Sequence, residues 1–504
     1  MLRRADLLLV LLFALQAAAI EPPPDRGKWF AFRADNVHVF SNASPAATRE
    51  LARDLVQMRH AIGQITKLDV RTPYTTRVFL FVDAKSLAPY LEAVIGQFLA
   101  LFRSGYDNTI KLRADAQGAV DRSTYHSIAE YVVEHTISSP PRWVLDGLAE
   151  YCSTLAAKEG AGLHRPIPGH VATLGQKSLL PLRELFSVTP GSPLYDGSRR
   201  AGIFHAQSWA LVHYLAGATE ERRAQFSQFL QRTNAGEPAG SAFEASFGIP
   251  HAQLEKELRQ HVQKLTTKST GSVPDELKGM DSPDPEPMTR DAVLYELGRL
   301  VASMREDHAV HAVKFFENAL ELNPRHAGAL ASLGRLHQYA GRMQEAESAF
   351  ARAIELGSDD PDVYLLLGRA IVDRYANTQP PQAEILKARS LFTKAAELRP
   401  DSALAWIGVG MTYVGSDDVA PGIAAMQRAQ ALDPREATAP RVLQALQEHQ
   451  QRMAINAAIA SAQAGKLIDA LVTLDQTIPN ITNEKLRQIA RKLREDVAKL
   501  ASRR

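Results

Sequence analysis

The sequence contains one cysteine, Cys152, in 504 residues. An intramolecular disulfide is therefore excluded, and so is a zinc site built from cysteine thiolates, because either needs at least two cysteines. A lone cysteine is usually a small buried hydrophobe, so we expect Cys152 to be inert. A role as a nucleophile would need a lowered pKa and a nearby histidine, which the sequence alone does not show.

The chain also lacks an excess of charge of one sign. It carries 58 Lys and Arg against 56 Asp and Glu, for a net charge of +2. Nucleic-acid-binding domains rely on a basic field or a recognisable motif, and neither is present, so we expect no nucleic-acid partner. The hydrophobic fraction of 45% and the charged fraction of 23% are ordinary for globular protein. The length allows two to four domains.

Long hydrophobic runs are absent except at the N-terminus. There Arg3 and Arg4 precede an apolar run that begins with Leu7–Phe13, and small residues at Ala17–Ala19 offer a cleavage site. The pattern predicts a signal peptide over 1–19, with an uncleaved N-terminal anchor as the alternative. The run is too short to span a bilayer comfortably, and no cysteine offers lipid attachment. We expect an exported chain, periplasmic or extracellular, without a membrane span after cleavage.

Residues 29–120 read as a mixed α/β region. Apolar, β-rich segments predict strands, and an amphipathic segment that starts with Ser44 as N-cap and Pro45 in its first turn predicts a helix. The strand candidates are "NVHVFSN" (36–42), "TRVFLFV" (76–82) and "NTIKLRA" (108–114). Residues 121–265 are mainly helical. Residues 266–290 are rich in Thr, Ser, Pro, Asp and Gly, which is typical of a linker.

A repeat follows the predicted linker. The segments "NALELNP", "RAIELGS", "KAAELRP" and "RAQALDP" start at 318, 352, 394 and 428, so their spacing is 34, 42 and 34 residues. A glycine precedes each, at Gly298, Gly334, Gly368 and Gly410. Small residues at fixed offsets let paired helices approach closely, and each pair buries its apolar face against the next. The region 291–504, with a C-terminal capping helix, resembles the tetratricopeptide repeat family, and a fifth unit is expected near Ala454.

Each of the first three repeat glycines is followed by an arginine: Arg299, Arg335 and Arg369. By resemblance to the repeat family, this position faces the concave groove of the solenoid. A ladder of guanidinium groups there would bind carboxylates of a protein or peptide partner. The alternative is that the three arginines are solvated and paired with nearby acids.

The stretch "YHSIAEYVVEHTISSPPRWVLDGLAEY" (125–151) has the outline of a zinc peptidase. Such a site needs two histidines one turn apart on a helix, a glutamate directly after the first to deprotonate the metal-bound water, and a third protein ligand. Here an apolar helix carries Glu130, a Pro break follows, and a second helix carries Asp146 and Glu150. The two histidines are missing.

Three segments resemble the peptidase-MA-like, gluzincin-type domain of uncharacterised exported bacterial proteins, which is often joined to tetratricopeptide repeats. They are "AEYVVEH", "PPRWVLDGLAEY" and "SLLPLRELF" followed by "FHAQSWALVHYL". The resemblance covers 29–265 and implies an α+β zincin-like fold, a small sheet plus helices, ahead of an all-α repeat solenoid. It places Glu130 at the general base and Asp146 at the third ligand, but puts Ala129 and Val133 at the two histidines.

Ala129 and Val133 cannot bind zinc, so we expect no metal and no cofactor at these positions. A different set, His126, Glu130 and Asp146, offers mixed nitrogen and oxygen ligands for zinc, but it lacks a glutamate directly after the first ligand. The alternative to a metal site is a set of ordinary side-chain contacts on a partly solvated helix face. The retained Trp143 and Gly147 are packing residues, which favours a domain that has kept its fold and lost its chemistry.

Three functions remain open. The first is an exported protein-interaction protein with a pseudopeptidase domain fused to tetratricopeptide repeats. The second is an active metal-dependent peptidase or hydrolase with atypical ligands, His126 and Asp146. The third is a structural adaptor in which the first domain only positions the repeats.

Overall fold

The computed structural model describes most of the chain in two compact units, Met1–Phe315 and Phe316–Arg504. The predicted signal peptide, 1–19, lies outside the described residues, as does the 266–283 part of the predicted linker. None of the described helices is long and apolar enough to cross a membrane. The described residues are 20–23, 27–34, 37–70, 75–90, 102–104, 107–113, 122–154, 165–195, 201–217, 219–265, 284–304, 309–375, 378, 380–434 and 436–502.

The first unit is built on a mixed sheet in the order β4-β5-β3-β2-β1-β6. The β2–β3 and β3–β5 pairs are parallel, and the other neighbours are antiparallel. The strands of the sheet are β1 (Phe30–Ala34), β2 (Val37–Ser41), β3 (Thr75–Phe81), β4 (Phe102–Ser104), β5 (Asp107–Arg113) and β6 (Glu286–Pro287). The sequence predicted three of them: β2, β3 and β5.

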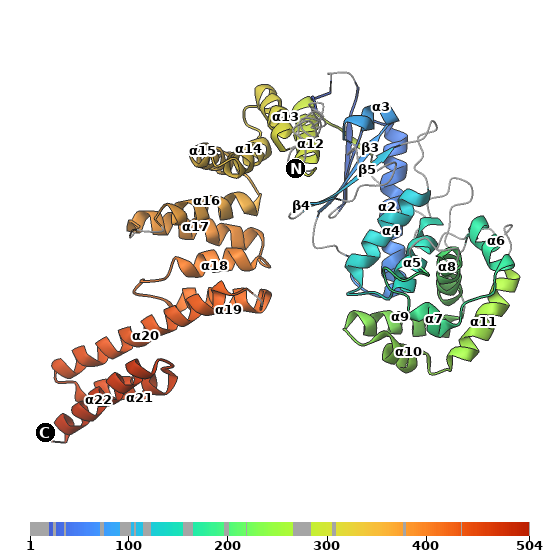
Figure 1. Ribbon diagram of the computed structural model, residues 1–504. Coiled ribbons are helices and arrows are strands. Elements are labelled where there is room, and N and C mark those ends of the chain that lie inside the picture. The colour runs from blue at the N-terminus through green and yellow to red at the C-terminus, as the bar shows by residue number, and fades with distance from the viewer. Residues whose placement is uncertain are drawn as a thin grey trace, which may run out of the picture. The chain divides into compact units, whose positions relative to one another are not determined.

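Helices pack on the sheet and form the larger part of the first unit (Figure 1). The predicted N-cap is confirmed: the Ser44 side chain accepts a hydrogen bond from the Ala47 backbone N–H, and α2 starts at Pro45. The helices are α2 (Pro45–Thr66), α3 (Ala84–Leu87), η1 (Ala88–Tyr90), α4 (Arg122–Thr136), α5 (Arg142–Ser153), α6 (Pro168–Gln176), α7 (Leu182–Phe186), α8 (Ala201–Gly217), α9 (Glu220–Asn234), α10 (Ala239–Phe247), α11 (His251–Lys264) and α12 (Arg290–Ala302).

The central strands alternate between two apolar faces. Val39 and Val78 are register partners and join the core that α2 contributes to, while Phe40 and Phe79 point the other way. On that second face the Arg77 guanidinium donates to the Glu296 carboxylate of α12 at 2.5 Å, and both side chains are buried. Helix α12 therefore docks on the side of the sheet opposite α2.

The segment 284–302 belongs to the first unit. Strand β6 pairs with β1, and the Met288 backbone N–H donates to the Trp29 carbonyl at 2.9 Å. The composition of 266–290 predicts a linker throughout, but its last residues add a strand to the sheet. The predicted start of the repeat domain at 291 differs from the boundary between the two units, which follows Phe315. Backbone pairing and the buried ion pair at Glu296 account for the difference.

The second unit is a run of paired helices (Figure 1). Its elements, with α13 at the boundary, are α13 (Ala309–Leu322), α14 (Ala327–Tyr339), α15 (Met343–Glu355), α16 (Pro361–Arg374), α17 (Gln382–Leu398), α18 (Ala403–Met411), α19 (Ala420–Leu432), α20 (Thr438–Gln463), α21 (Leu467–Thr477), η5 (Ile478–Asn480) and α22 (Glu484–Ala501). Helix α20 is continuous through Ala454, so the prediction that a fifth unit starts near Ala454 is wrong. The helix starts at Thr438.

The repeat glycines bring helix pairs into contact. A Cβ on Gly334 would lie 2.5 Å from the ring of Phe350, and one on Gly368 would lie 2.9 Å from the ring of Phe392. Real Cβ atoms do not approach other atoms so closely, so these positions admit only glycine without a shift of the rings. Gly410 meets Met426 in the same way, at 2.6 Å. The predicted role of the glycines at helix crossings is confirmed.

Candidate functional site

The zinc-peptidase-like stretch forms two helices, α4 and α5, which pack against each other. Pro141 immediately precedes α5, so the predicted Pro break separates the helices. Gly147 of α5 lets α8 approach, because a Cβ there would lie 2.6 Å from the Ser208 carbonyl oxygen. Trp143 is buried and stacks on Phe186 at a ring-centroid distance of 5.0 Å. The retained motif residues therefore pack as predicted.

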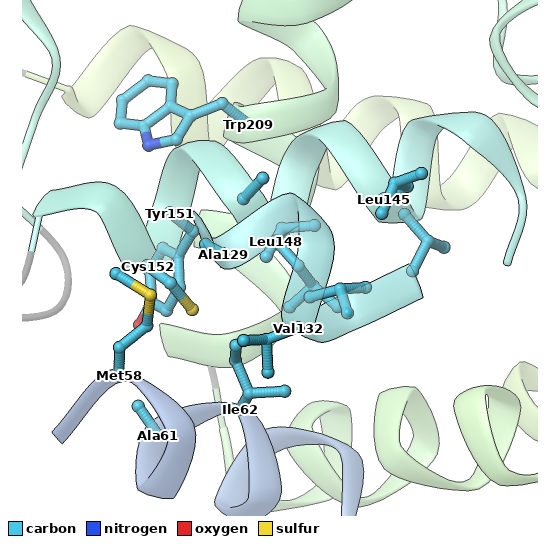
Figure 2. Packing of buried hydrophobic residues seen from close by; sticks show 14 of the residues in the cluster. Met58, Ala61, Ile62, Ala129, Val132, Leu145, Leu148, Tyr151, Cys152 and Trp209 are labelled. Carbon is cyan, nitrogen blue, oxygen red and sulfur yellow. The ribbon is translucent and has the colours of Figure 1, made fainter. Parts of the chain in front are cut away.

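The two positions that would carry zinc-binding histidines lie in the hydrophobic core. Ala129 and Val133 are both 0% exposed. Figure 2 shows Ala129 and Val132 among buried side chains of α5, including Leu148, Tyr151 and Cys152. Burial raises the pKa of the Cys152 thiol to about 12, so this cysteine is an inert core residue, as expected.

A guanidinium joins the two carboxylates that the resemblance singled out. Arg142 Nη2 donates to Glu130 Oε1 at 2.9 Å, and Arg142 Nε lies 3.2 Å from Asp146 Oδ2. His205 Nδ1 lies 3.4 Å from Asp146 Oδ1, and the Arg142 guanidinium stacks over the Tyr195 ring at 4.3 Å. The side chain of Asp146 is only 3% exposed, so it depends on these cationic and polar partners.

The third carboxylate, Glu150, has a different set of partners. His126 Nδ1 lies 3.6 Å from its Oε1, His170 Nε2 lies 3.4 Å from the same oxygen, and Arg122 donates to its Oε2. Burial raises the pKa of Glu150, but the contact with His170 and the positive charges of His126, His170 and Arg122 outweigh it and lower the pKa to about 2. Glu150 is therefore ionised at neutral pH.

The predicted metal set of His126, Glu130 and Asp146 is divided between these two groups. His126 Nε2 lies 4.0 Å from Glu130 Oε2, while Asp146 is held by Arg142 and His205. Within the described ranges, no three His, Cys, Asp or Glu side chains stand ready to hold a metal ion. Together the groups form a polar cluster on α4, α5, α6, α8 and the segment that precedes α8. It is defined here as Arg122, His126, Glu130, Arg142, Asp146, Glu150, His170, Tyr195 and His205.

Buried polar atoms without a hydrogen bond concentrate in and beside the polar cluster. They include His126 Nδ1, His170 Nε2, Arg142 Nε and Asp146 Oδ2, and also Ser208 and Trp209 on α8. The nitrogens of the first group lie at ion-pair distance from carboxylates, but without hydrogen-bond geometry. Ion-pair contacts therefore hold these nitrogens of the cluster.

Sequence reasoning missed Arg122, Arg142, His170 and Tyr195. Arg142 stands four residues before Asp146, so an ion pair on one helix face could have been inferred from spacing alone. His170 and Tyr195 come from separate segments, and nothing local in the sequence relates them to α4 or α5. The His135 side chain contacts its own helix, with Nδ1 2.8 Å from the Tyr131 carbonyl oxygen.

The three predicted arginines of the repeats all have partners, two on their own helices and one, for Arg335, at the start of α16. Arg299 donates to Tyr295 Oη at 3.1 Å, Arg335 donates to Asp360 at 2.7 Å, and Arg369 lies 3.4 Å from Asp373. Arg299 belongs to the first compact unit and the other two to the second. The contacts of Arg335 and Arg369 agree with the alternative that these arginines pair with nearby acids. A row of arginines that binds the carboxylates of a partner stays a prediction.

A family comparison identifies part of the C-terminal region. Residues 304–370 match the tetratricopeptide repeat family. The helix pairs within this range are tetratricopeptide repeats. Such repeats imply a role in protein–protein interaction. No curated protein has a significant match to the sequence.

Several solved structures of tetratricopeptide repeat proteins are similar to part of the chain. YrrB, described as having an unusual peptide-binding site, is 20% identical over 40% of this chain and 90% of its own, with a TM-score of 0.24. A thermophilic repeat protein of Thermus thermophilus, TTC0263, is 20% identical over 40% and 98%, also with a TM-score of 0.24. PilF of Pseudomonas aeruginosa is 14% identical over 42% and 91%, again with a TM-score of 0.24. At these scores the similarities carry no information on ligands.

Proposed function

We propose that the chain is an exported protein-interaction protein, in which a zincin-like domain without peptidase activity is fused to tetratricopeptide repeats. The observation that supports the loss of activity is the burial of Ala129 and Val133, which offer only methyl groups to the core. The contacts of Arg142 with Glu130 and Asp146 add to it, because a guanidinium already balances the two carboxylates. The repeats supply the binding surface for a protein or peptide partner.

Export follows from the predicted signal peptide at 1–19, whose residues lie outside the described part of the chain. A cell-fractionation experiment tests it. The full chain is expected in the exported fraction, and replacement of Leu8 and Leu9 by Arg is expected to hold it in the cytoplasm. Equal amounts of wild type and variant in the exported fraction would contradict export by this segment.

The absence of peptidase chemistry is tested with the full chain and a mixture of peptide substrates, with and without added zinc. We expect the same cleavage rate for wild type as for Glu130→Gln, because Glu130 binds Arg142 and has no metal-bound water to activate. A wild-type rate that exceeds that of Glu130→Gln by tenfold or more would establish the alternative, a hydrolase with atypical ligands.

The interaction role is tested by cross-linking the full chain to its partners and identifying them. Arg335→Ala with Arg369→Ala is expected to weaken capture of the partner recovered with wild type. Arg352→Ala is the matched control, because Arg352 is 52% exposed and paired with Glu355 on its own helix, α15. Capture that is the same in all three proteins would remove the arginines from the binding surface. If the first unit alone captures the partner, the binding surface lies in the first unit and not in the repeats.

A further inference from the structure

The last helix, α22, has a local excess of positive charge. Residues 484–501 contain six Lys and Arg and three Asp and Glu, a net charge of +3, whereas the whole chain carries +2. Figure 1 shows α22 at the C-terminal end of the run of helices. A basic segment of this kind attracts an anionic partner by its field.

The inner side of α22 is already occupied by contacts within the chain. Ala490 and Val497 are buried, and Leu486 and Leu493 pack against the same apolar cluster, which also includes residues of α20 and α21. Two arginines of the helix have acidic partners, because Arg487 pairs with Glu484 and Arg494 pairs with Asp475 of α21. The side of α22 that can meet a partner is therefore the exposed one.

A row of lysines runs along this exposed side. Lys485, Lys492 and Lys499 recur at every seventh position, so they lie on one face of the helix, about two turns apart. All three are exposed, and none makes an ion pair within the described residues. Ile489 and Leu500 lie beside the row and are 60% and 53% exposed. We call this surface the basic face: Lys485, Ile489, Lys492, Asp496, Lys499 and Leu500.

The composition of the basic face fits a lipid surface better than a protein surface. Protein interfaces are enriched in aromatic residues and arginine and depleted in lysine, but residues 484–501 contain no aromatic residue, and the row consists of lysines. Lysines near a membrane are attracted by anionic headgroups without a shaped pocket, and exposed apolar side chains enter the headgroup boundary. Asp496, also exposed on this face, reduces its charge from +3 to +2.

We propose that the basic face of α22 docks on an anionic lipid surface, with the three lysines on the headgroups and Ile489 and Leu500 inserted between them. Docking is peripheral and reversible, because two apolar side chains and a net charge of +2 give weak attachment. It holds the C-terminal end of the helical run at a membrane. The proposal is independent of the repeats' interaction with a protein partner.

The test is co-sedimentation of the full chain with vesicles. One set consists of phosphatidylcholine, and in the other phosphatidylglycerol replaces about a third of it, which gives an anionic surface. We expect sedimentation with the anionic set that falls as salt is raised above about 0.1 M. Each lysine contributes about fivefold to binding, so Lys485→Gln with Lys492→Gln and Lys499→Gln should weaken it by about a hundredfold.

The matched control removes the same charge from paired surface residues on other helices. Lys314, Arg352 and Lys394 each pair with a glutamate and are about half exposed, so their triple replacement by Gln should bind the vesicles as wild type does. Residues 1–19 are identical in all proteins, so the difference between the two triple variants reports α22. Equal binding by both triple variants would overturn the proposal.

A local probe gives a second readout. A polarity-sensitive dye on Ile489→Cys reports the basic face alone, because Cys152 is buried and does not react. We expect a blue shift of the dye with the anionic vesicles and none with phosphatidylcholine. No shift with either set would overturn the proposal. Retention of wild type, but not of the lysine variant, on a polyglutamate resin would then assign the face to an acidic protein.

Discussion

At the residue scale, Arg142 is the positive partner of two carboxylates, Glu130 and Asp146. A buried carboxylate needs a positive partner, and in a zinc peptidase that partner would be the metal ion. Here the guanidinium contacts Glu130 and Asp146 at once, and Tyr195 holds it from its face. Glu130 is therefore engaged in an ion pair, and its position in the motif does not by itself make it a general base.

The lowered pKa of Glu150 makes the free energy of unfolding depend on pH. Its pKa is about 2 in the folded state against 4.5 in the unfolded state, so it stabilises the fold above pH 4.5 and this contribution is lost as the pH falls toward 2. We expect Glu150→Gln to lower the free energy of unfolding by about 3 kcal/mol at pH 6, and by progressively less below pH 4.5. Urea unfolding, followed by tryptophan fluorescence in a Trp406→Phe background, reports the first unit alone.

Asp54 provides a control with the opposite sign. It is buried and accepts a hydrogen bond from the Tyr125 hydroxyl at 2.7 Å; burial raises its pKa to about 6. Protonated Asp54 stabilises the fold below pH 4, and this stabilisation is lost as the pH rises through 6, because the buried carboxyl then becomes charged. We therefore expect Asp54→Asn to stabilise the first unit at pH 7 but not at pH 4. If both variants show the same pH trend, the assigned directions are wrong.

Helix α12 shows at the element scale how a polar pair selects a docking site. Glu296 is buried among apolar side chains; burial raises its pKa, and Arg77 and Arg33 counteract this. We expect Glu296→Leu or Arg77→Leu alone to cost about 3–5 kcal/mol, because each leaves a buried charge without its counterpart. The double variant should cost less than either single one. Urea unfolding of all four proteins gives the coupling energy; simple additivity would show that the pair is not coupled.

The glycines of the repeats make a second prediction at the element scale. In Gly334→Ala the new methyl group would meet the Phe350 ring, and overpacking of this kind costs about 1–3 kcal/mol, more than the helix propensity gained. Gly240→Ala in α10 is the control, since nothing lies within 4 Å of its Cβ, and it should be neutral or slightly stabilising. Thermal unfolding of the two variants separates the effects. Equal melting temperatures would mean that the Phe350 ring moves aside freely.

At the scale of the whole molecule, the boundary between the two units follows Phe315, although the repeat pattern already begins with Gly298. Helix α12 fits the sequence register of the repeats, but it belongs to the first unit. Its buried Glu296 forms an ion pair with Arg77 of β3, and the preceding strand β6 pairs with β1. The first unit therefore extends beyond residue 265.

A pair of fragments tests this organisation. Residues 20–304 should give a folded, soluble protein, whereas residues 20–265 lack β6 and α12 and expose Phe40 and Phe79 on the uncovered sheet face. We expect the shorter fragment to aggregate or to melt at a lower temperature. Circular dichroism and size-exclusion chromatography measure both. Equal stability of the two fragments would show that α12 is only an appendage.

Much of the local structure could be predicted from single residues. Ser44 and Pro45 mark the start of α2, Pro141 ends the break before α5, and the repeat glycines mark the crossings of the helix pairs. These signals act over one or two turns of backbone or recur at a fixed spacing, which is why they are readable. Strand β6 was missed because two residues in a polar, Pro-rich segment have no periodicity to detect.

The sequence by itself determined that the stretch 125–151 has no imidazole at Ala129 and Val133, and that tetratricopeptide repeats follow, because both depend only on residue type and spacing. Only the tertiary structure decided which charges meet: Arg142 with Glu130 and Asp146, His126 and His170 with Glu150, and Arg77 with Glu296. The physical reason is that these pairs join helices and strands far apart in the chain. Their partners are set by how apolar faces pack, and many packings share the same local pattern.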